Sequence, residues 1–126
     1  MYSDTILEHF QSPRNVGELE QSDADADDEN PVCGDRIHLW LRIHDGVIVR
    51  AGWKGDGCTP ALAAASVVSE MLQGMSVDQA RALSRDAVAG ALGGLPARKA
   101  HAAALAVSVV HKAIVAYDLQ DHSAHN

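Results

Sequence analysis

The sequence is poor in several kinds of residue, and each shortage excludes a class of protein. Aromatic residues make up only 4% of the 126 residues, so the core must be built from small aliphatic side chains in close contact. With only two cysteines, the chain lacks the disulfide framework of small secreted domains. Ten lysines and arginines face 17 aspartates and glutamates, and a net charge of −7 argues against nucleic acid and anionic membrane surfaces as partners.

Targeting and membrane signals are missing as well. We find no run that we expect to be long and apolar enough to span a bilayer, and the N-terminus lacks the basic stretch and apolar core of a signal peptide. We therefore predict a cytoplasmic protein whose cysteines are thiols rather than a disulfide. An apolar fraction of 47% over this length predicts a single domain over residues 1–126.

What the chain does contain is an ordered series of helix signals. The residues expected to start helices are Ser3, Thr59 with Pro60 behind it, the capping box Ser76–Gln79, and Ser84. The first helix runs through Phe10, the second stops at Gly74, and the last runs from Ala97 to Leu119. Residues 121–126 are expected to be a frayed tail.

Strand signals lie between the first two helices. Residues 36–44 alternate apolar and polar side chains, which predicts a half-buried strand, and Asp45-Gly46 marks a turn into a returning strand over residues 47–54. We favour a three-residue turn, because it places Ile43 opposite Val49 and gathers the apolar side chains on one face. Residues 18–30 are acidic, with almost no large apolar side chains, and are expected to form a mobile solvated loop. The order of elements predicts an α+β domain.

Two cysteines flank this predicted hairpin. Cys33 lies in the run Pro31–Asp35, where Gly34 allows a turn that would bring the thiolate and the Asp35 carboxylate onto one ion. Cys58 lies immediately before the second helix, where backbone N–H groups and the helix dipole favour the thiolate. The alternative interpretation is two inert buried thiols, because the pair lacks a CxxC spacing.

The histidines carry a weaker signal than the cysteines. His101 lies near the start of the last helix, and a single histidine there is more often structural than a ligand. We interpret five others as solvated: His38, His44, His111, His122 and His125. The last two are spaced so that they could bind a metal adventitiously.

Several motifs together resemble the NifU/IscU family of iron–sulfur cluster scaffolds, and the resemblance covers nearly the whole chain. The matching segments are Tyr2-Ser3, His9-Phe10, Pro13–Gly17, Cys33–Asp35, Gly57-Cys58, Gly74–Ser76, Leu95-Pro96 and Lys99–His101. The resemblance implies an α+β fold with a small antiparallel sheet of about three strands packed against a cluster of helices. It also implies a non-enzymatic scaffold or carrier that works with a cysteine desulfurase and with apo iron–sulfur client proteins.

The family's site uses three cysteines, the aspartate of the CGD motif and a histidine before the third cysteine. Carried over by position, the implied ligands to a metal or cluster are Cys33, Asp35, Cys58 and His101. The third cysteine is replaced by Ala102, which can neither ligate a cluster nor accept sulfur. The family's chaperone-recognition segment, Leu-Pro-Pro-Val-Lys, reads Leu95-Pro96-Ala97-Arg98-Lys99 here, which argues against recognition by an Hsp70-type chaperone.

The remaining ligand set leaves two functional hypotheses and a weaker third. Two sulfurs, one oxygen and one nitrogen suit a tetrahedral zinc ion, and a 2Fe-2S cluster also accepts two non-cysteine ligands. The protein is therefore predicted to be an iron–sulfur cluster assembly scaffold or carrier. The alternative is a divergent, non-assembling paralogue that binds zinc or regulates a cysteine desulfurase. A sulfurtransfer enzyme using a Cys58 persulfide ranks last.

Overall fold

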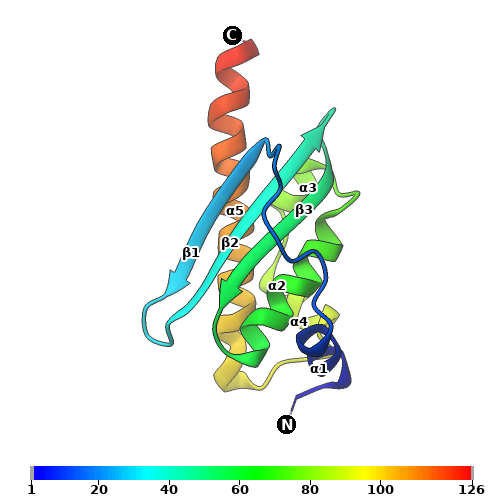
Figure 1. The fold of residues 1–126 in the computed structure, drawn as a ribbon, viewed down its shortest axis with the longest axis vertical. Helices are drawn as coiled ribbons and strands as arrows, with labels where there is room; N and C mark the ends of the chain where they lie inside the picture. Colours follow the sequence, from blue (N-terminus) through cyan, green and yellow to red (C-terminus); the bar gives the residue numbers. More distant parts are fainter. Residues whose placement is uncertain (1, 126) are drawn as a thin grey trace.

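The computed structural model describes residues 2–125, with the side chains of residues 2–120, and shows a three-stranded sheet backed by helices (Figure 1). The elements in chain order are α1 (Asp4–Gln11), β1 (Ala24–Asn30), β2 (Asp35–His44), β3 (Val47–Asp56), α2 (Thr59–Leu72), α3 (Val77–Arg81), α4 (Arg85–Ala91), the 3₁₀ turn η1 (Ala97–Lys99) and α5 (Ala100–His125).

All three strands are antiparallel, in the order β1-β2-β3, and the helices lie on one face of the sheet (Figure 1). The long helix α5 packs against β1 and β2, and α2 packs against β3 and α5. The predicted α+β architecture with a small antiparallel sheet is therefore confirmed. This arrangement brings the start of α5, the start of α2 and the β1–β2 connection to the same end of the sheet.

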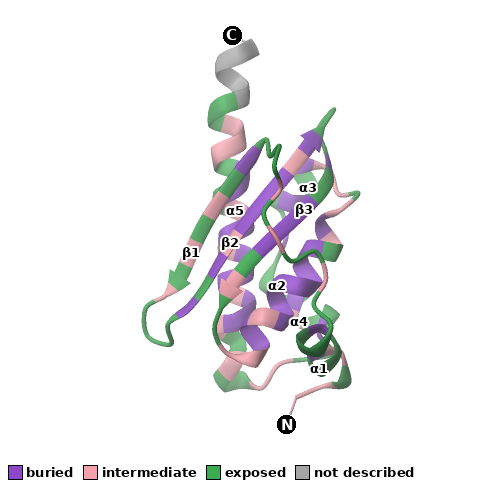
Figure 2. Cartoon of the chain, in the orientation of Figure 1, coloured by how far each residue is buried: buried purple, intermediate pink, exposed green. Residues whose placement is uncertain are grey.

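Small side chains build the core, as the scarcity of aromatic residues predicts. Most of β2 is buried (Figure 2). Its alternate residues Ile37, Leu39 and Leu41 belong to one buried cluster with residues of α2 and α5. Both helices contribute buried alanines to this contact, including Ala64 and Ala106. Because alanine adds little volume between the elements, the helices can lie close to the sheet.

The expected mobile loop over residues 18–30 is wrong for its second half, because Ala24–Asn30 forms strand β1. Burial alternates along it, and Asp28 on its inner side is bonded by Ser108 and Lys112 of α5. Burial alone would raise the pKa of Asp28, but these two contacts and the N–H of Glu29 lower it overall. The Asp28 carboxylate, which in the sequence suggested a loop, is thus bound by partners that are distant along the chain.

The β2–β3 hairpin combines the two registers that the sequence allows. Near the turn Ile43 lies opposite Ile48, as in a two-residue turn, so the three-residue turn is wrong there. A register shift between Arg42 and Ile43 then places Leu41 opposite Ala51 and Leu39 opposite Trp53, as predicted. This β-bulge keeps Ile48 buried and leaves Val49 exposed.

Most predicted helix starts are confirmed. The side chains of Ser3 and Ser84 cap α1 and α4, and Ser76 caps α3 in a full capping box with Gln79. The N-cap of α2 is Cys58 rather than Thr59, so that prediction is wrong by one residue.

The last helix differs at both ends from the prediction. A short 3₁₀ turn precedes α5, which then continues to His125, past the predicted end at Leu119 and through most of the predicted frayed tail. The side chains of residues 121–126, and with them His122 and His125 as metal ligands, lie outside the described residues.

The expectation that no run could span a membrane is wrong on length and composition. The stretch Ala97–Gln120 contains an 18-residue window with a mean hydropathy of 1.5, which is long and apolar enough to cross a bilayer. Half of this window is buried inside the protein, and α5 packs on β1, β2 and α2. Its apolar composition therefore has a structural cause, since a core helix of a soluble protein passes the same test.

Candidate metal centre

Three segments that are distant in sequence carry the four predicted ligands to one end of the sheet. Cys33 lies in the connection between β1 and β2, and Asp35 is the first residue of β2. Cys58 is the N-cap of α2, and His101 is the second residue of α5. Gly34, with a φ of +78°, provides the turn between the first two, as expected for a residue without a Cβ.

Three of the four donor atoms converge. The ligand atoms of Cys33, Asp35 and His101 lie within 4.8 Å of one another. His101 Nε2 lies 3.6 Å from Cys33 Sγ and 3.4 Å from Asp35 Oδ2. For zinc bonds of about 2.0–2.3 Å, donor atoms at neighbouring corners of a tetrahedron are roughly 3.3–3.8 Å apart. The two distances therefore match edges of such a tetrahedron.

Cys58 approaches this group through Asp35. Its Sγ lies 3.6 Å from Asp35 Oδ2, again close to a tetrahedral edge, and its backbone N–H donates to Asp35 Oδ1 at 2.9 Å. Asp35 is only 1% exposed, whereas Cys58 is half-buried and Cys33 is exposed. The carboxylate is thus the buried hub of the centre, and the Cys33 sulfur is its most accessible donor.

The electrostatics of Cys58 differ from the sequence expectation of a favoured thiolate. Burial raises the pKa of the Cys58 thiol, and the neighbouring Asp35 carboxylate raises it further. The N–H of Ala61 and the ammonium of Lys99 act in the opposite direction without offsetting burial. The free protein therefore holds Cys58 as a thiol, which argues against an intrinsically reactive persulfide carrier. A bound cation would reverse this balance, because coordination deprotonates a thiol.

The position of the missing third cysteine is fully buried. Ala102 follows His101 on α5 and is 0% exposed, outside the main hydrophobic core cluster. Its methyl group offers no donor atom.

Not all of the remaining histidines are solvated. His38 is half-buried, stacks on Trp40 with ring centroids 4.0 Å apart, and lies 2.7 Å from Asp25. His111 is half-buried against the carbonyl of Leu83, whereas His44 is exposed as predicted.

His9 was not among the residues predicted to have a role, yet it is buried, with 4% of its surface exposed. Its Nδ1 lies 2.7 Å from Ser66 Oγ on α2, and that hydroxyl also accepts from the N–H of Arg14. Burial lowers the pKa of His9, and Arg14 lowers it further, although Glu70 and Glu8 act to raise it. The network ties α1 and the following loop to the helix that carries Cys58. The motif segments around His9 and Pro13 were the only sequence signal for it.

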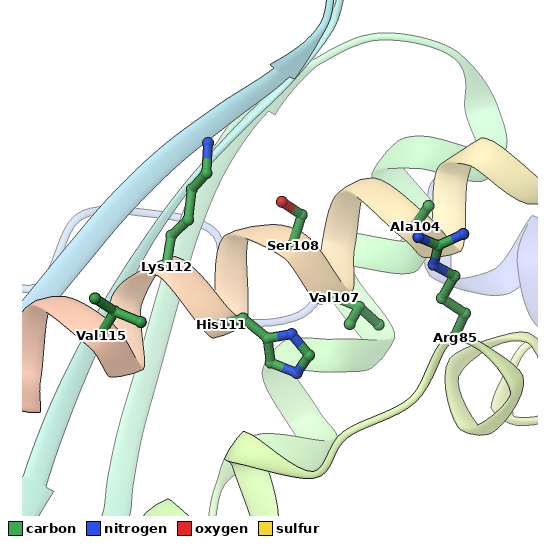
Figure 3. A pocket seen from close by; sticks show the side chains of 7 residues that line it. All are labelled: Arg85, Ala104, Val107, Ser108, His111, Lys112 and Val115. Atoms are coloured by element: carbon green, nitrogen blue, oxygen red, sulfur yellow. The ribbon is translucent and has the colours of Figure 1, made fainter.

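A cavity separate from the ligand group lies on the helical side of the protein. A hollow of about 460 Å³ lies along the outer side of α5, where Arg85 overhangs Ala104 and His111 points away from Lys112 (Figure 3). A neighbouring hollow of about 410 Å³ includes His101 in its wall. The polar side chains of the first hollow do not converge on a common point, so the metal centre is the better candidate for chemistry.

The sequence matches known proteins over nearly its whole length. The family model described as "NifU-like N terminal domain" matches residues 1–124. A protein of Archaeoglobus fulgidus, "Iron-sulfur cluster assembly scaffold protein IscU 1", is 43% identical over 117 residues, which cover 93% of this chain and 76% of that protein. The "Iron-sulfur cluster assembly scaffold protein IscU" of Escherichia coli K12 is 35% identical over 120 residues, covering 92% and 93% of the two chains.

Solved structures agree on the fold. The NifU-like N-terminal protein from Brucella abortus is similar with a TM-score of 0.81 at 22% identity, covering 94% of each chain. A putative scaffold protein for the SUF system from Fervidobacterium islandicum gives a TM-score of 0.73 at 17% identity, covering 90% of this chain and 96% of that chain.

Proposed function

The chain belongs to the NifU-like N-terminal domain family, and on that premise we propose that it is an iron–sulfur cluster scaffold or carrier. The observation that carries the proposal is the convergence of sulfur, oxygen and nitrogen donors from Cys33, Asp35 and His101, with Cys58 beside them. Relatives that match over most of this chain are named assembly scaffolds, which favours this function over a non-assembling regulator.

The donor chemistry accounts for a cargo that is held and then released. Thiolates are the preferred ligands of iron–sulfur clusters, and Cys33 and Cys58 supply two of them. The Asp35 carboxylate and the His101 imidazole complete a four-ligand set, with His101 taking the place left by Ala102. Because oxygen and nitrogen donors bind a cluster less tightly than thiolates, the cargo is held loosely enough to be passed on.

The proposed partners follow from what the chain lacks. A scaffold of this kind does not generate sulfide, so a cysteine desulfurase supplies persulfide sulfur, an external electron donor reduces it to sulfide, and apo iron–sulfur proteins of the cytoplasm receive the cluster. The exposed Cys33 is the donor that such partners reach first. Ala97 and Arg98, which replace family residues of the chaperone segment, are exposed, so an Hsp70-type chaperone would meet the altered side chains directly.

Zinc suits the donor types of all four residues. Its tetrahedral preference matches the distances from His101 to Cys33, from His101 to Asp35 and from Cys58 to Asp35, and zinc tolerates the mixed ligand set better than a cluster does. We propose that zinc occupies the centre when no cluster is present.

Anaerobic reconstitution with iron, cysteine, a desulfurase and a thiol reductant tests the proposal. We expect a cluster absorption spectrum with equal amounts of iron and acid-labile sulfide, and transfer of that cluster to an apo-ferredoxin. Ala102→Cys should prolong cluster retention and slow transfer, because it adds a thiolate beside His101. Folded protein that binds one zinc ion but gains no sulfide under these conditions would contradict the proposal.

A further inference from the structure

The residue before Cys58 leaves space for a carboxylate. Gly57 has a φ of +151°, and a Cβ added to it would meet Asp35 first. The three nearest atoms all belong to the Asp35 side chain, and Oδ1 would be closer than real Cβ atoms ever come to a neighbour. Although Oδ1 ends the Asp35 side chain, Cβ and Cγ of Asp35 would also lie 3.0 Å from the added Cβ, so rotating the carboxylate alone would not relieve the contact. The absence of a side chain at position 57 is therefore what allows the carboxylate to lie against this loop.

The carboxylate uses that space to hold the backbone of Cys58. Asp35 Oδ1 accepts the N–H of Cys58 at 2.9 Å, and at 1% exposure the bond is shielded from competition by water. Cys58 is the N-cap of the 14-residue helix α2, whose dipole favours a negative charge at this end. The Cys58 sulfur makes no capping hydrogen bond of good geometry, although the N–H of Ala61 is near enough to act on its pKa, and the carboxylate of Asp35 supplies the contact that fixes this turn.

The two oxygens of Asp35 therefore have different tasks. Oδ1 faces the backbone of Cys58, whereas Oδ2 faces His101 Nε2 at 3.4 Å and Cys58 Sγ at 3.6 Å. Oδ1 has one of its two lone pairs engaged by the Cys58 N–H, so Oδ2 is the oxygen better placed to bind a cation. Asp35 can thus offer one oxygen to a cargo while the other keeps Cys58 in place.

We infer that Gly57 and Asp35 form a clamp that fixes Cys58 at the centre before any cargo arrives. Gly57 is a positioning residue in this clamp, acting through Asp35, and Asp35 is a positioning residue for Cys58 in addition to its proposed role as a ligand. The benefit of the clamp rests on the proposed function: a Cys58 that is already held in place loses less conformational freedom when cargo binds. The geometry itself is present in the free protein.

Hydrogen–deuterium exchange of the Cys58 amide, followed by NMR in the metal-free protein, tests the clamp. Asp35→Ala removes the acceptor and Gly57→Ala displaces it, so each should speed exchange of this amide roughly tenfold or more. Asp35→Asn keeps an amide oxygen at the same position and should preserve most of the protection. Adding Gly57→Ala to Asp35→Ala should speed exchange much less than Gly57→Ala does alone, because the acceptor is already absent and only the Cβ of residue 35 remains near position 57.

A matched control separates the clamp from backbone strain. Gly17 has a φ of +131°, and an added Cβ would meet nothing within 4 Å, so Gly17→Ala strains the chain without touching Asp35. Its Cys58 amide should remain protected. Equal loss of protection in Gly17→Ala, or unchanged protection in Asp35→Ala, would overturn the clamp. If Gly57→Ala does not fold, the comparison of Asp35→Ala with Asp35→Asn still decides.

A second readout links the clamp to the centre. Titration with cobalt should give weaker thiolate-to-cobalt absorption in Gly57→Ala than in Gly17→Ala at equal concentrations, because only the former disturbs Cys58. Unaltered cobalt absorption in Gly57→Ala, with a freely exchanging Cys58 amide, would contradict the clamp's part in ligand placement. Because the exchange experiment uses neither iron nor sulfide, it can succeed even if no cluster is assembled, so failure of the proposed function remains distinguishable.

Discussion

The two cysteines of the centre are held in opposite ways. Cys33 is exposed in a turn next to Val32, which is itself 92% exposed, and a Cβ added at Gly34 would meet nothing within 4 Å. Cys58 is half-buried, hydrogen-bonded through its backbone to Asp35, and continuous with α2. One thiol is thus accessible to a partner, and the other is fixed to the protein interior.

This difference teaches how a carrier can satisfy two opposing requirements. A cargo must be reached by donors and acceptors in solution, and it must not be lost between them. The accessible Cys33 serves the first requirement, whereas the anchored Cys58 and the buried Asp35 serve the second. The predictions below either remove this asymmetry or measure it, in order of decreasing expected effect.

Loss of either thiolate should have the largest effect. Cys33→Ser and Cys58→Ser should each weaken zinc binding by at least about 100-fold, because even residues that only support a ligand contribute 10- to 100-fold. Competition with a chromogenic chelator would measure this. Similar losses in both variants are expected, since a ligand is required whether it is accessible or anchored. A variant that keeps full zinc affinity would remove that cysteine from the centre.

Alanine substitutions at Gly34 and Gly57 should lower the free energy of unfolding by different amounts, because Gly34 is next to Cys33 and Gly57 is next to Cys58. Gly34→Ala meets only the cost of its positive φ, about 1 kcal/mol in the free energy of unfolding. Gly57→Ala adds a collision with Asp35, and we expect about 3 kcal/mol. Urea denaturation of the metal-free variants gives both values. If the two substitutions cost the same, the Cys58 loop is no more tightly held than the Cys33 loop.

Thiol labelling should report the asymmetry directly. In the metal-free protein iodoacetamide should modify Cys33 roughly tenfold faster than Cys58 at neutral pH, because Cys33 is exposed and burial raises the pKa of Cys58. Mass spectrometry of the two peptides over time gives both rates. Saturating zinc should slow both reactions, and faster labelling of Cys58 would reverse the assignment of accessible and anchored thiols.

Acidification should lower the stability of the part of the protein that anchors Cys58, and we expect this to be the smallest of the effects. The pKa of His9 is lowered in the folded protein, so below its ordinary value of 6.5 the unfolded chain binds a proton that the folded chain resists. Stability should therefore be complete above that pH and fall as the pH drops below it, by no more than about 1 kcal/mol between pH 6.5 and 5.5.

A substitution at His9 provides the check on this pH effect. His9→Asn can still bond Ser66 but does not titrate, so its unfolding free energy should vary less with pH over the same range, as measured by urea denaturation. A wild-type profile that is flat from pH 7 to 5.5 would contradict the role of His9 in tying α1 to the helix of Cys58.

Much of the fold could be predicted because its signals are local. Side-chain caps at Ser3, Ser76 and Ser84 lie within three residues of the N–H groups they satisfy, and the alternation along β2 requires no knowledge of the rest of the chain. Strand β1 was missed for the opposite reason. Its inner Asp28 is satisfied by Ser108 and Lys112, 80 or more residues away, and no local pattern reveals such partners.

The motifs predicted which residues form the candidate site, but they did not predict how those residues contact one another. The spacing of Cys33 and Asp35 around a glycine indicated convergence, but the approach of His101 depends on how α5 packs against the sheet. The raised pKa of Cys58 likewise comes from burial and from Asp35, which outweigh the helix terminus visible in the sequence. Long-range packing therefore decided the features that local chemistry left open.

X-ray absorption at the zinc edge of the zinc-loaded protein tests most directly the claim that these unequal halves build one mixed-ligand centre. The account predicts two sulfur ligands at about 2.3 Å and two nitrogen or oxygen ligands at about 2.0 Å from the metal. Cys58→Ser should reduce the sulfur count to one. A wild-type spectrum with four nitrogen or oxygen ligands and no sulfur would contradict the claim, because neither cysteine would then hold the metal.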